Sequence, residues 1–368
     1  MNRIRVGFDV TPLYSGHKIR GVGFYTSRLV NELKNFNYLE VVEIKNENDK
    51  EQKLDLLHIP YFSPFQVTLP MTKNFPLVVT IHDLIPLKYP DNYPPGIKGK
   101  LKFELQKALI KNADLIITDS KASKKDIISL LGISENKIEV TYLAPDQNHR
   151  PLKNKDGFTK EKISQLKTKY QLPKKFVLYV GDVNFNKNIP SLIKACKIIK
   201  KPLVIVGKQA ATPPQDPKHI ENSDLVLLQD QANKYKYSQK DNKFSITLTG
   251  FVSDEELTQI YNLACVYCQP SIDEGFGLPV LEAMACGCPV VCSDRGSLPE
   301  IAGKAAYLSS PEPKDLAKAI KKVLSSKKLA LTLRKKGLIR SKKFTWKKTA
   351  KQTQRLYRRT IINCPRVY

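Results

Sequence analysis

The chain has 368 residues, of which 41% are hydrophobic, and its formal net charge at pH 7 is +26. This length favours two domains, and the apolar fraction suffices for cores that need neither a structural metal nor disulfides. The seven cysteines are an odd number, and the first residues alternate like a strand instead of forming a signal peptide, so a secreted disulfide scaffold is excluded and we expect a cytoplasmic protein.

Positive charge concentrates in two segments. Residues 314–368 contain 19 lysines and arginines against one acid, and residues 98–125 contain eight lysines against three acids. A general lysine bias explains these segments, and so does attraction to anionic lipid, to which each well-placed cation contributes about 1 kcal/mol. Nucleic acid is disfavoured as a partner because no binding module or basic–aromatic pattern accompanies the charge. A peripheral position on the inner face of the plasma membrane therefore stays open.

The first part of the chain alternates between apolar strand-like runs and helical stretches. This alternation predicts an α/β domain built on a parallel sheet that is covered on both faces. We expect strands at residues 4–10, 54–59, 77–81, 115–118 and 138–142, and helices near residues 22–35, 97–112 and 121–131.

The alternation restarts after a polar, proline-containing segment at 144–156. Doubly wound domains are therefore predicted at 1–150 and 151–345, with an amphipathic helix at the end of the chain. In the second domain we expect strands at 176–181, 203–206, 225–228, 246–248, 266–269 and 290–292, and helices at 188–200, 253–264, 279–286, 313–325 and 327–343.

The most informative segment follows the strand that is expected to end near Gln269. A glycine-bearing loop leads to Pro279, which suits the first position of a helix, and Gly287 is suited to close that helix. The start of a helix presents backbone amides and a positive dipole end, which suit a diphosphate. Gly275 and Gly277 let the backbone approach such a ligand closely.

Two acids bracket this helix start, Glu274 in the loop and Glu282 in what we expect to be the first turn. Carboxylates accept hydrogen bonds from sugar hydroxyls, so the two acids together with the amides predict a site for a sugar diphosphate. The alternative is that both acids only complement the helix dipole, which leaves the glycines unexplained.

Four cysteines have the spacing of metal-binding knuckles, Cys265-x-x-Cys268 and Cys286-x-Cys288. The first pair lies in an apolar strand-like run, and the second flanks the expected helix end. We therefore expect small buried side chains here rather than a metal site.

With these motifs in place, the sequence resembles the retaining glycosyltransferases of the GT-B fold, known as group 1 or glycosyltransferase family 4. The glycine loop at 16–25 and the Thr-x-His-Asp-Leu-x-Pro stretch at 80–86 are similar to the mannosyl- and rhamnosyltransferase-like members of cell-surface polysaccharide assembly. Further segments carry the resemblance: 250–257, the block from Glu274 to Glu282, 289–291, 297–303 and 344–346.

The resemblance implies both a fold and a reaction. The fold has two doubly wound Rossmann-like domains that face each other across a cleft, an acceptor domain at 1–150 and a nucleotide-sugar donor domain at 151–345, with helix 346–363 packed back onto the first. The reaction is metal-independent transfer of a hexose, with mannose favoured, to a glycan or lipid-linked acceptor. GDP-mannose is the favoured donor and a UDP-sugar the second choice, and no cofactor is expected. The sequence contains no Asp-x-Asp, which agrees with a site without a metal.

The resemblance also implies roles for single residues. Glu274 would contact hydroxyls of the donor sugar, Glu282 the ribose, and Lys187 the pyrophosphate, whose developing charge it would stabilise. His82, at the end of a strand, would reach the donor sugar, so His82, Lys187 and Glu274 form the expected catalytic set. The other expected donor-binding positions are Gly21, Gly23, Gly181, Phe251, Val252, Gly275, Phe276, Gly277 and Leu278.

Alternatives remain at this point. Lys187 also fits an ordinary lysine at a helix start, and His82 a structural histidine. Related members usually carry an arginine at the position of Asn186, and some carry one at the position of Asp182. This loss of positive charge leaves open a non-catalytic nucleotide-sugar-binding protein, and an epimerase or hydrolase on the same fold stays open as well.

Overall fold

The computed structural model describes residues 3–16, 21–45, 53–153, 156, 158–236 and 244–364. The chain divides into two compact units, one formed by Met1–Ala144 with Phe344–Tyr368 and the other by Pro145–Lys343. The second unit begins a few residues before the position expected from the sequence, and His149 belongs to it.

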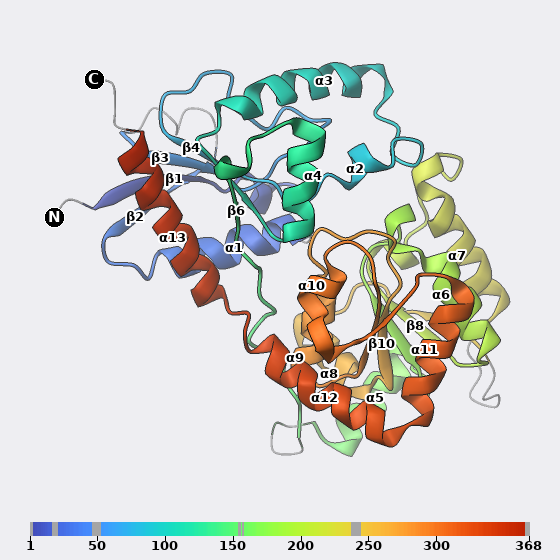
Figure 1. Cartoon of the computed structure of the whole chain (residues 1–368). Helices are drawn as coiled ribbons and strands as arrows, with labels where there is room; N and C mark the ends of the chain where they lie inside the picture. The colour runs from blue at the N-terminus through green and yellow to red at the C-terminus, as the bar shows by residue number, and fades with distance from the viewer. Residues whose placement is uncertain are drawn as a thin grey trace. The chain divides into compact units, whose positions relative to one another are not determined.

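The first unit is built on a parallel six-stranded sheet with the strand order β2-β1-β3-β4-β5-β6 (Figure 1). Its strands are β1 (Ile4–Asp9), β2 (Leu39–Ile44), β3 (Leu56–Ile59), β4 (Leu77–Thr80), β5 (Leu115–Thr118) and β6 (Ile138–Val140). Its helices are α1 (Gly21–Leu33), α2 (Ile85–Lys88), α3 (Gly96–Leu109), α4 (Lys121–Leu131) and α13 (Trp346–Asn363), with 3₁₀ turns η1 (Thr11–Tyr14), η3 (Ile110–Asn112) and η4 (Glu135–Lys137).

Strand β2 is absent from the sequence-based prediction. It lies at the edge of the sheet, beside β1, and only its two end residues, Leu39 and Ile44, are buried. The inner strands β3, β4 and β5 are buried along their whole length and therefore read as continuous apolar runs. An edge strand with two glutamates lacks that signal.

The second unit also has a parallel six-stranded sheet, with the order β12-β11-β10-β7-β8-β9. Its strands are β7 (Val177–Val180), β8 (Leu203–Val206), β9 (Ile246–Leu248), β10 (Val266–Gln269), β11 (Val290–Ser293) and β12 (Tyr307–Ser309). Its helices are α5 (Lys160–Tyr170), α6 (Ile189–Ile198), α7 (Ser223–Lys234), α8 (Asp254–Leu263), α9 (Leu278–Ala285), α10 (Leu298–Ala302), α11 (Pro313–Ser325) and α12 (Lys327–Ser341), with 3₁₀ turns η6 (Phe185–Lys187), η7 (Gln209–Ala211), η8 (Ile220–Asn222) and η9 (Gly303–Ala305).

The strand predicted at 225–228 is wrong, because these residues lie in helix α7. Leu225 and Leu228 are the buried residues of α7 and are spaced three apart, as one face of a helix requires. A run of only four apolar residues does not distinguish a strand from the buried side of a helix.

A buried polar chain joins α13 to the sheet of the first unit. Tyr357 on α13 lies 2.5 Å from Nδ1 of His58, whose Nε2 lies 2.8 Å from the Thr80 hydroxyl, and that hydroxyl lies 3.0 Å from Tyr25 Oη. Burial lowers the pKa of His58 to about 3, so the ring is neutral and needs a partner at each nitrogen. The Tyr357 hydroxyl therefore stabilises the folded state.

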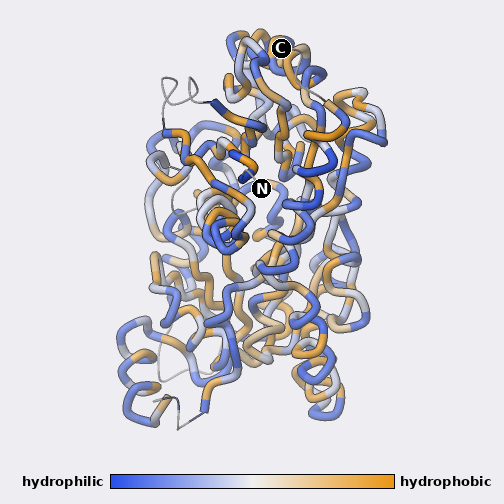
Figure 2. Tube along the Cα trace, turned by 90° about the vertical axis from the view of Figure 1, so that its left-hand side faces the viewer, coloured by the Kyte–Doolittle hydropathy of each residue, from blue (hydrophilic) through white to orange (hydrophobic). Residues whose placement is uncertain are grey.

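Hydrophilic and hydrophobic residues alternate along most helices (Figure 2). In α13 the buried residues lie along one face, while lysines and arginines occupy the other. Within the described ranges, no helix has the length and apolar character needed to cross a membrane.

Tyr357→Phe tests the buried chain, because it removes one hydroxyl and leaves His58 Nδ1 without its partner. We expect the free energy of unfolding to fall by about 1–3 kcal/mol, measured by chemical denaturation. Tyr14→Phe is the matched control, since Tyr14 is 67% exposed and the loss there should stay within about 0.5 kcal/mol. Equal effects of the two substitutions would contradict this account of His58.

Candidate functional site

The second sheet reverses its strand order between β7 and β10, which are neighbours although β8 and β9 intervene in the sequence. In open α/β sheets, ligands bind beyond the carboxyl ends of the strands at such a point. Turn η6 follows β7 and carries Lys187, and the loop after β10 carries Glu274. Two of the three expected catalytic residues therefore reach the same edge of this sheet.

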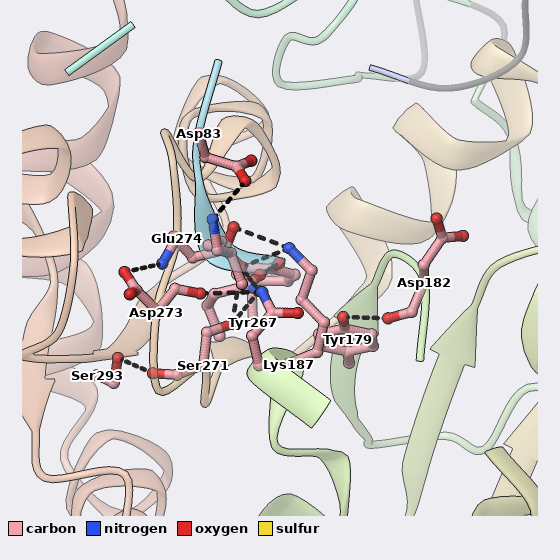
Figure 3. Close-up of polar contacts among 12 residues, drawn as sticks. Asp83, Tyr179, Asp182, Lys187, Tyr267, Ser271, Asp273, Glu274 and Ser293 are labelled. Carbon is pink, nitrogen blue, oxygen red and sulfur yellow. Dashed lines mark hydrogen bonds and ion pairs between the residues drawn. The ribbon is translucent and has the colours of Figure 1, made fainter. Parts of the chain in front are cut away.

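Lys187 and Glu274 form an ion pair there (Figure 3). Lys187 Nζ donates to Glu274 Oε1 at 2.9 Å and to Oε2 at 2.8 Å. Glu274 Oε1 also accepts hydrogen bonds from Gln269 Nε2 at 2.8 Å and from the Ser271 hydroxyl at 2.7 Å. The Glu274 side chain is only 7% exposed, so these donors replace the water that burial removes.

The Gln269 amide has a fixed orientation. Tyr267, whose pKa burial raises, keeps its phenolic proton and donates it to Gln269 Oε1, which turns Gln269 Nε2 toward Glu274. Tyr267 and Gln269 both lie on β10, so this strand fixes the position of the Gln269 amide that donates to the Glu274 carboxylate.

The loops after β7 and β10 are hydrogen-bonded to each other. The backbone carbonyl of Asn186 accepts from Ile272 N at 2.9 Å, and its side-chain Nδ2 donates to Asp273 O at 3.1 Å. Asn188 Nδ2 donates to Pro270 O at 3.0 Å. The buried Asn186, which replaces an expected arginine, therefore supports the loop that carries Glu274.

Helix α9 begins at Leu278, one residue before the predicted start, with Pro279 in its first turn. Gly277 precedes the helix with φ +88°, and Gly287 follows it with φ +74°, the conformation expected for a helix-closing glycine. Glu282 is the fifth helical residue, so its expected place in the first turn is wrong.

Glu282 is buried and held by protein groups at both oxygens. Tyr261 on α8 donates its hydroxyl proton to Glu282 Oε2 at 2.9 Å. Nε2 of His149 lies 3.6 Å from Glu282 Oε1. Neither Tyr261 nor His149 figured among the sequence-based candidates.

The other expected donor-binding positions of the second unit lie after β7, after β9 and around the start of α9. Gly181 has φ +143°, and a Cβ on it would lie 3.0 Å from Tyr179 Oη, so glycine is required there. Phe251 is 67% exposed, whereas Val252 and Phe276 are buried. Gly275, Gly277 and Leu278 are also buried or half-buried, on the same loop and helix start.

His82 lies in the first unit, directly after β4, and both of its ring nitrogens have acceptors. Nδ1 is 2.5 Å from Asp119 Oδ2, and Nε2 is 3.1 Å from Pro60 O. Burial opposes a charge on the ring, but Asp119 outweighs it and raises the pKa of His82 above its usual value. Since both partners only accept, the ring is held as an imidazolium and is not a free base. Gly21 and Gly23, expected in a loop, lie in the first turn of α1, and part of the expected glycine loop, 17–20, lies outside the described residues.

Cys268, Cys286 and Cys288 are buried, and burial raises the pKa of each thiol. Among the described residues, no group of three or more histidine, cysteine and acidic side chains is arranged to hold a metal ion.

Comparison with known proteins relates this geometry to a family. Residues 161–340 match the family model of the Glycosyl transferases group 1, and residues 10–147 match that of Glycosyltransferase Family 4. O-antigen chain mannosyltransferase B of Escherichia coli is 30% identical over 289 residues, which are 76% of this chain and 70% of that protein. The chain belongs to the family 4 glycosyltransferases.

Other relatives of this family 4 chain differ from it in length or in sequence. The serotype-specific mannosyltransferase WbdA of Escherichia coli is 30% identical over 281 residues, so the match spans 74% of this chain but only about a third, 32%, of WbdA. The structure of Anabaena HepE in complex with UDP-glucose superposes with a TM-score of 0.69 at 18% identity, covering 96% of this chain and 99% of HepE. Together with the two parallel sheets, this likeness confirms the GT-B fold class.

Gly296 is a further site residue that the sequence analysis missed in this family 4 chain. It has φ +55°, and a Cβ on it would lie 2.6 Å from Glu274 N and 2.7 Å from Asp273 Oδ1. Ser297 N also donates to Glu274 O at 3.2 Å. The turn before α10 therefore packs directly under the loop that carries Glu274, and only glycine fits there.

Gly296→Ala should destabilise the chain by about 1–3 kcal/mol more than Gly250→Ala, measured by chemical denaturation. Both glycines have a positive φ, +55° and +70°, but a Cβ on Gly250 would meet only the Ala211 side chain at 3.5 Å, an ordinary contact. The difference between the two variants isolates the clash with the Glu274 loop. Equal losses would show that the loop moves aside without cost.

Proposed function

We propose that this chain is a metal-independent, retaining glycosyltransferase that transfers a hexose from a nucleotide-sugar to a glycan or lipid-linked acceptor. Family membership supports a glycosyltransferase, and the pairing of Lys187 with Glu274 at the carboxyl ends of β7 and β10 carries the assignment of the donor site. At the point where the strand order reverses, the lysine can bind the leaving phosphate and the carboxylate can bind sugar hydroxyls.

The proposed mechanism uses charge and position. Lys187 stabilises the negative charge that develops on the leaving nucleoside diphosphate, which is the task that other transferases give to a metal. Glu274 orients the sugar through its hydroxyls, so the acceptor meets the anomeric carbon on the face that the phosphate leaves. The departing phosphate oxygen takes the proton of the acceptor hydroxyl, and the configuration is retained.

A mannose-like donor is favoured, with GDP-mannose before a UDP-sugar. The support is the names of the relatives, O-antigen chain mannosyltransferase B and the serotype-specific mannosyltransferase WbdA. The complex of Anabaena HepE with UDP-glucose keeps UDP-sugars as the second choice. An O-antigen-like glycan on a lipid carrier is the corresponding acceptor class.

Glu274→Gln and Lys187→Gln should each reduce transfer by about a hundredfold or more, because each removes a charge from the proposed site. Transfer is measured by product analysis with and without acceptor, over a panel of nucleotide-sugars, and a chelator should leave the wild-type rate unchanged. Lys34→Gln is the matched control, since it breaks an exposed ion pair with Glu43 in the first unit.

Near-normal turnover in either site variant would contradict the assignment. Donor cleavage without acceptor would identify a hydrolase, and donor binding without turnover would identify a non-catalytic binding protein.

The second part of the proposal concerns location. Because the proposed acceptor is linked to a lipid, we propose a cytoplasmic position against the anionic inner face of the plasma membrane. Helix α3 exposes Ile97 (83%) and Leu101 (69%) beside lysines at 98, 100 and 102. In segment 314–368, α12 likewise exposes Leu331 and Ile339 among basic residues. Exposed apolar side chains next to cations suit an interface between headgroups and acyl chains.

The triple variant Lys98→Glu, Lys100→Glu, Lys102→Glu should lose at least about tenfold of its binding to vesicles that contain anionic lipid. Binding is measured by co-sedimentation, and added salt should weaken it in the wild type. The control variant changes the net charge by the same amount at exposed positions of the second unit that lie outside both basic segments. Its substitutions are Lys162→Glu, Lys174→Glu and Lys175→Glu. Vesicle binding by the wild type that is independent of anionic lipid content and of salt would contradict this part of the proposal.

A further inference from the structure

His149 is fixed in a turn at the beginning of the second unit. Its backbone N–H donates to the backbone carbonyl of Asp146 at 3.0 Å. Directly afterwards, Asn262 on α8 clamps the backbone, since its Nδ2 donates to Arg150 O at 3.0 Å and its Oδ1 accepts from Leu152 N at 2.9 Å. The side chain of His149 is 5% exposed and therefore has little freedom to turn away from its neighbours.

The protonation of the ring follows from Thr258. While the Thr258 hydroxyl donates its only proton to Asp254 O at 2.9 Å, its oxygen accepts from Nδ1 of His149, which lies 2.9 Å away, and we assign a hydrogen to Nδ1 on this arrangement. The other nitrogen, Nε2, is the one that lies 3.6 Å from Glu282 Oε1.

In this geometry, the charge state of His149 determines how strongly the ring holds the Glu282 carboxylate. If the ring were neutral, a lone pair on Nε2 would face a carboxylate oxygen, whereas an imidazolium pairs with it. Burial lowers the pKa of His149, but Glu282, followed by Asp146 and Asp254, outweighs burial and raises the pKa above 6.5.

The remaining groups around His149 do not compete for its proton. Tyr261 packs edge-on against the ring with a centroid distance of 5.7 Å, and burial raises its pKa, so it stays a donor to Glu282 Oε2. Burial also raises the pKa of Cys286, which approaches the backbone of Arg150, so this thiol stays neutral.

We propose that His149 is a positioning residue for the donor nucleotide. Its imidazolium and the Tyr261 hydroxyl hold Glu282 from the protein side, one at each oxygen, so that the remaining lone pairs of the carboxylate accept the ribose hydroxyls. The inference rests on the proposed function and on the contact between Glu282 and the ribose that the family resemblance implies. Loss of the positive charge on His149 weakens this hold on Glu282.

The first test compares GDP with its 2′,3′-dideoxy counterpart by calorimetric titration of the full chain between about pH 6 and about pH 9. We expect the affinity for GDP to fall as the pH rises through the raised pKa of His149. The affinity for the dideoxy compound, which has no ribose diol for Glu282 to hold, should not show this fall.

Three variants separate positioning from a merely structural role. His149→Phe should weaken GDP binding about tenfold at the acid end and abolish the pH dependence. His149→Gln keeps a donor that does not titrate, and Thr258→Val frees Nδ1 to lose its proton while Nε2 keeps one, so both should bind GDP up to higher pH than the wild type does. His219→Gln, at an exposed histidine, should match the wild type.

The possible failures are distinguishable. A wild-type chain that binds neither GDP nor UDP at any pH contradicts the proposed function together with this inference. A wild type that binds GDP while His149→Phe binds it equally well overturns the role of His149 alone. An equal loss for GDP and its dideoxy counterpart in His149→Phe also overturns it, because the effect would then not pass through the ribose.

Discussion

The proposed donor site depends on an ion pair in a place to which water has little access. Glu274 is buried, and a buried carboxylate is tolerated only when hydrogen bonds and an opposite charge replace its hydration. Lys187, Gln269 and Ser271 supply these, and each is itself placed by a regular element or a short turn next to one. The requirement explains why so much of the surrounding sequence is polar and yet buried.

The same requirement explains the pairing of the two loops. A lysine on one loop and a glutamate on another form a stable pair only if the loops keep their spacing, and the side chains of Asn186 and Asn188 fix it. An arginine at position 186, expected by family resemblance, would remove the amide that bonds to Asp273. Asn186 therefore has a structural role in joining the two loops.

Much of this structure was predictable from the sequence, for identifiable reasons. Inner strands such as β4 and β5 are continuous apolar runs, and Glu274, Lys187 and Gly287 belong to local motifs. The edge strand β2 and helix α7 lacked a clear period and were missed or misassigned. His149 was missed because its ring depends on Thr258, 109 residues away, and no local pattern records that contact. The roles of the expected donor-binding residues stay predictions.

The path of the chain has a consequence for its synthesis on the ribosome. The chain leaves the first unit after Ala144 and returns to it at Phe344. The first unit is therefore complete only after α13 has been synthesised. Until that helix emerges, the nascent first unit lacks the hydroxyl that satisfies His58 and leaves apolar surface of α1 uncovered. The second unit, by contrast, is contiguous and has every strand it needs by then. Translation order thus favours completion of the second unit before the first.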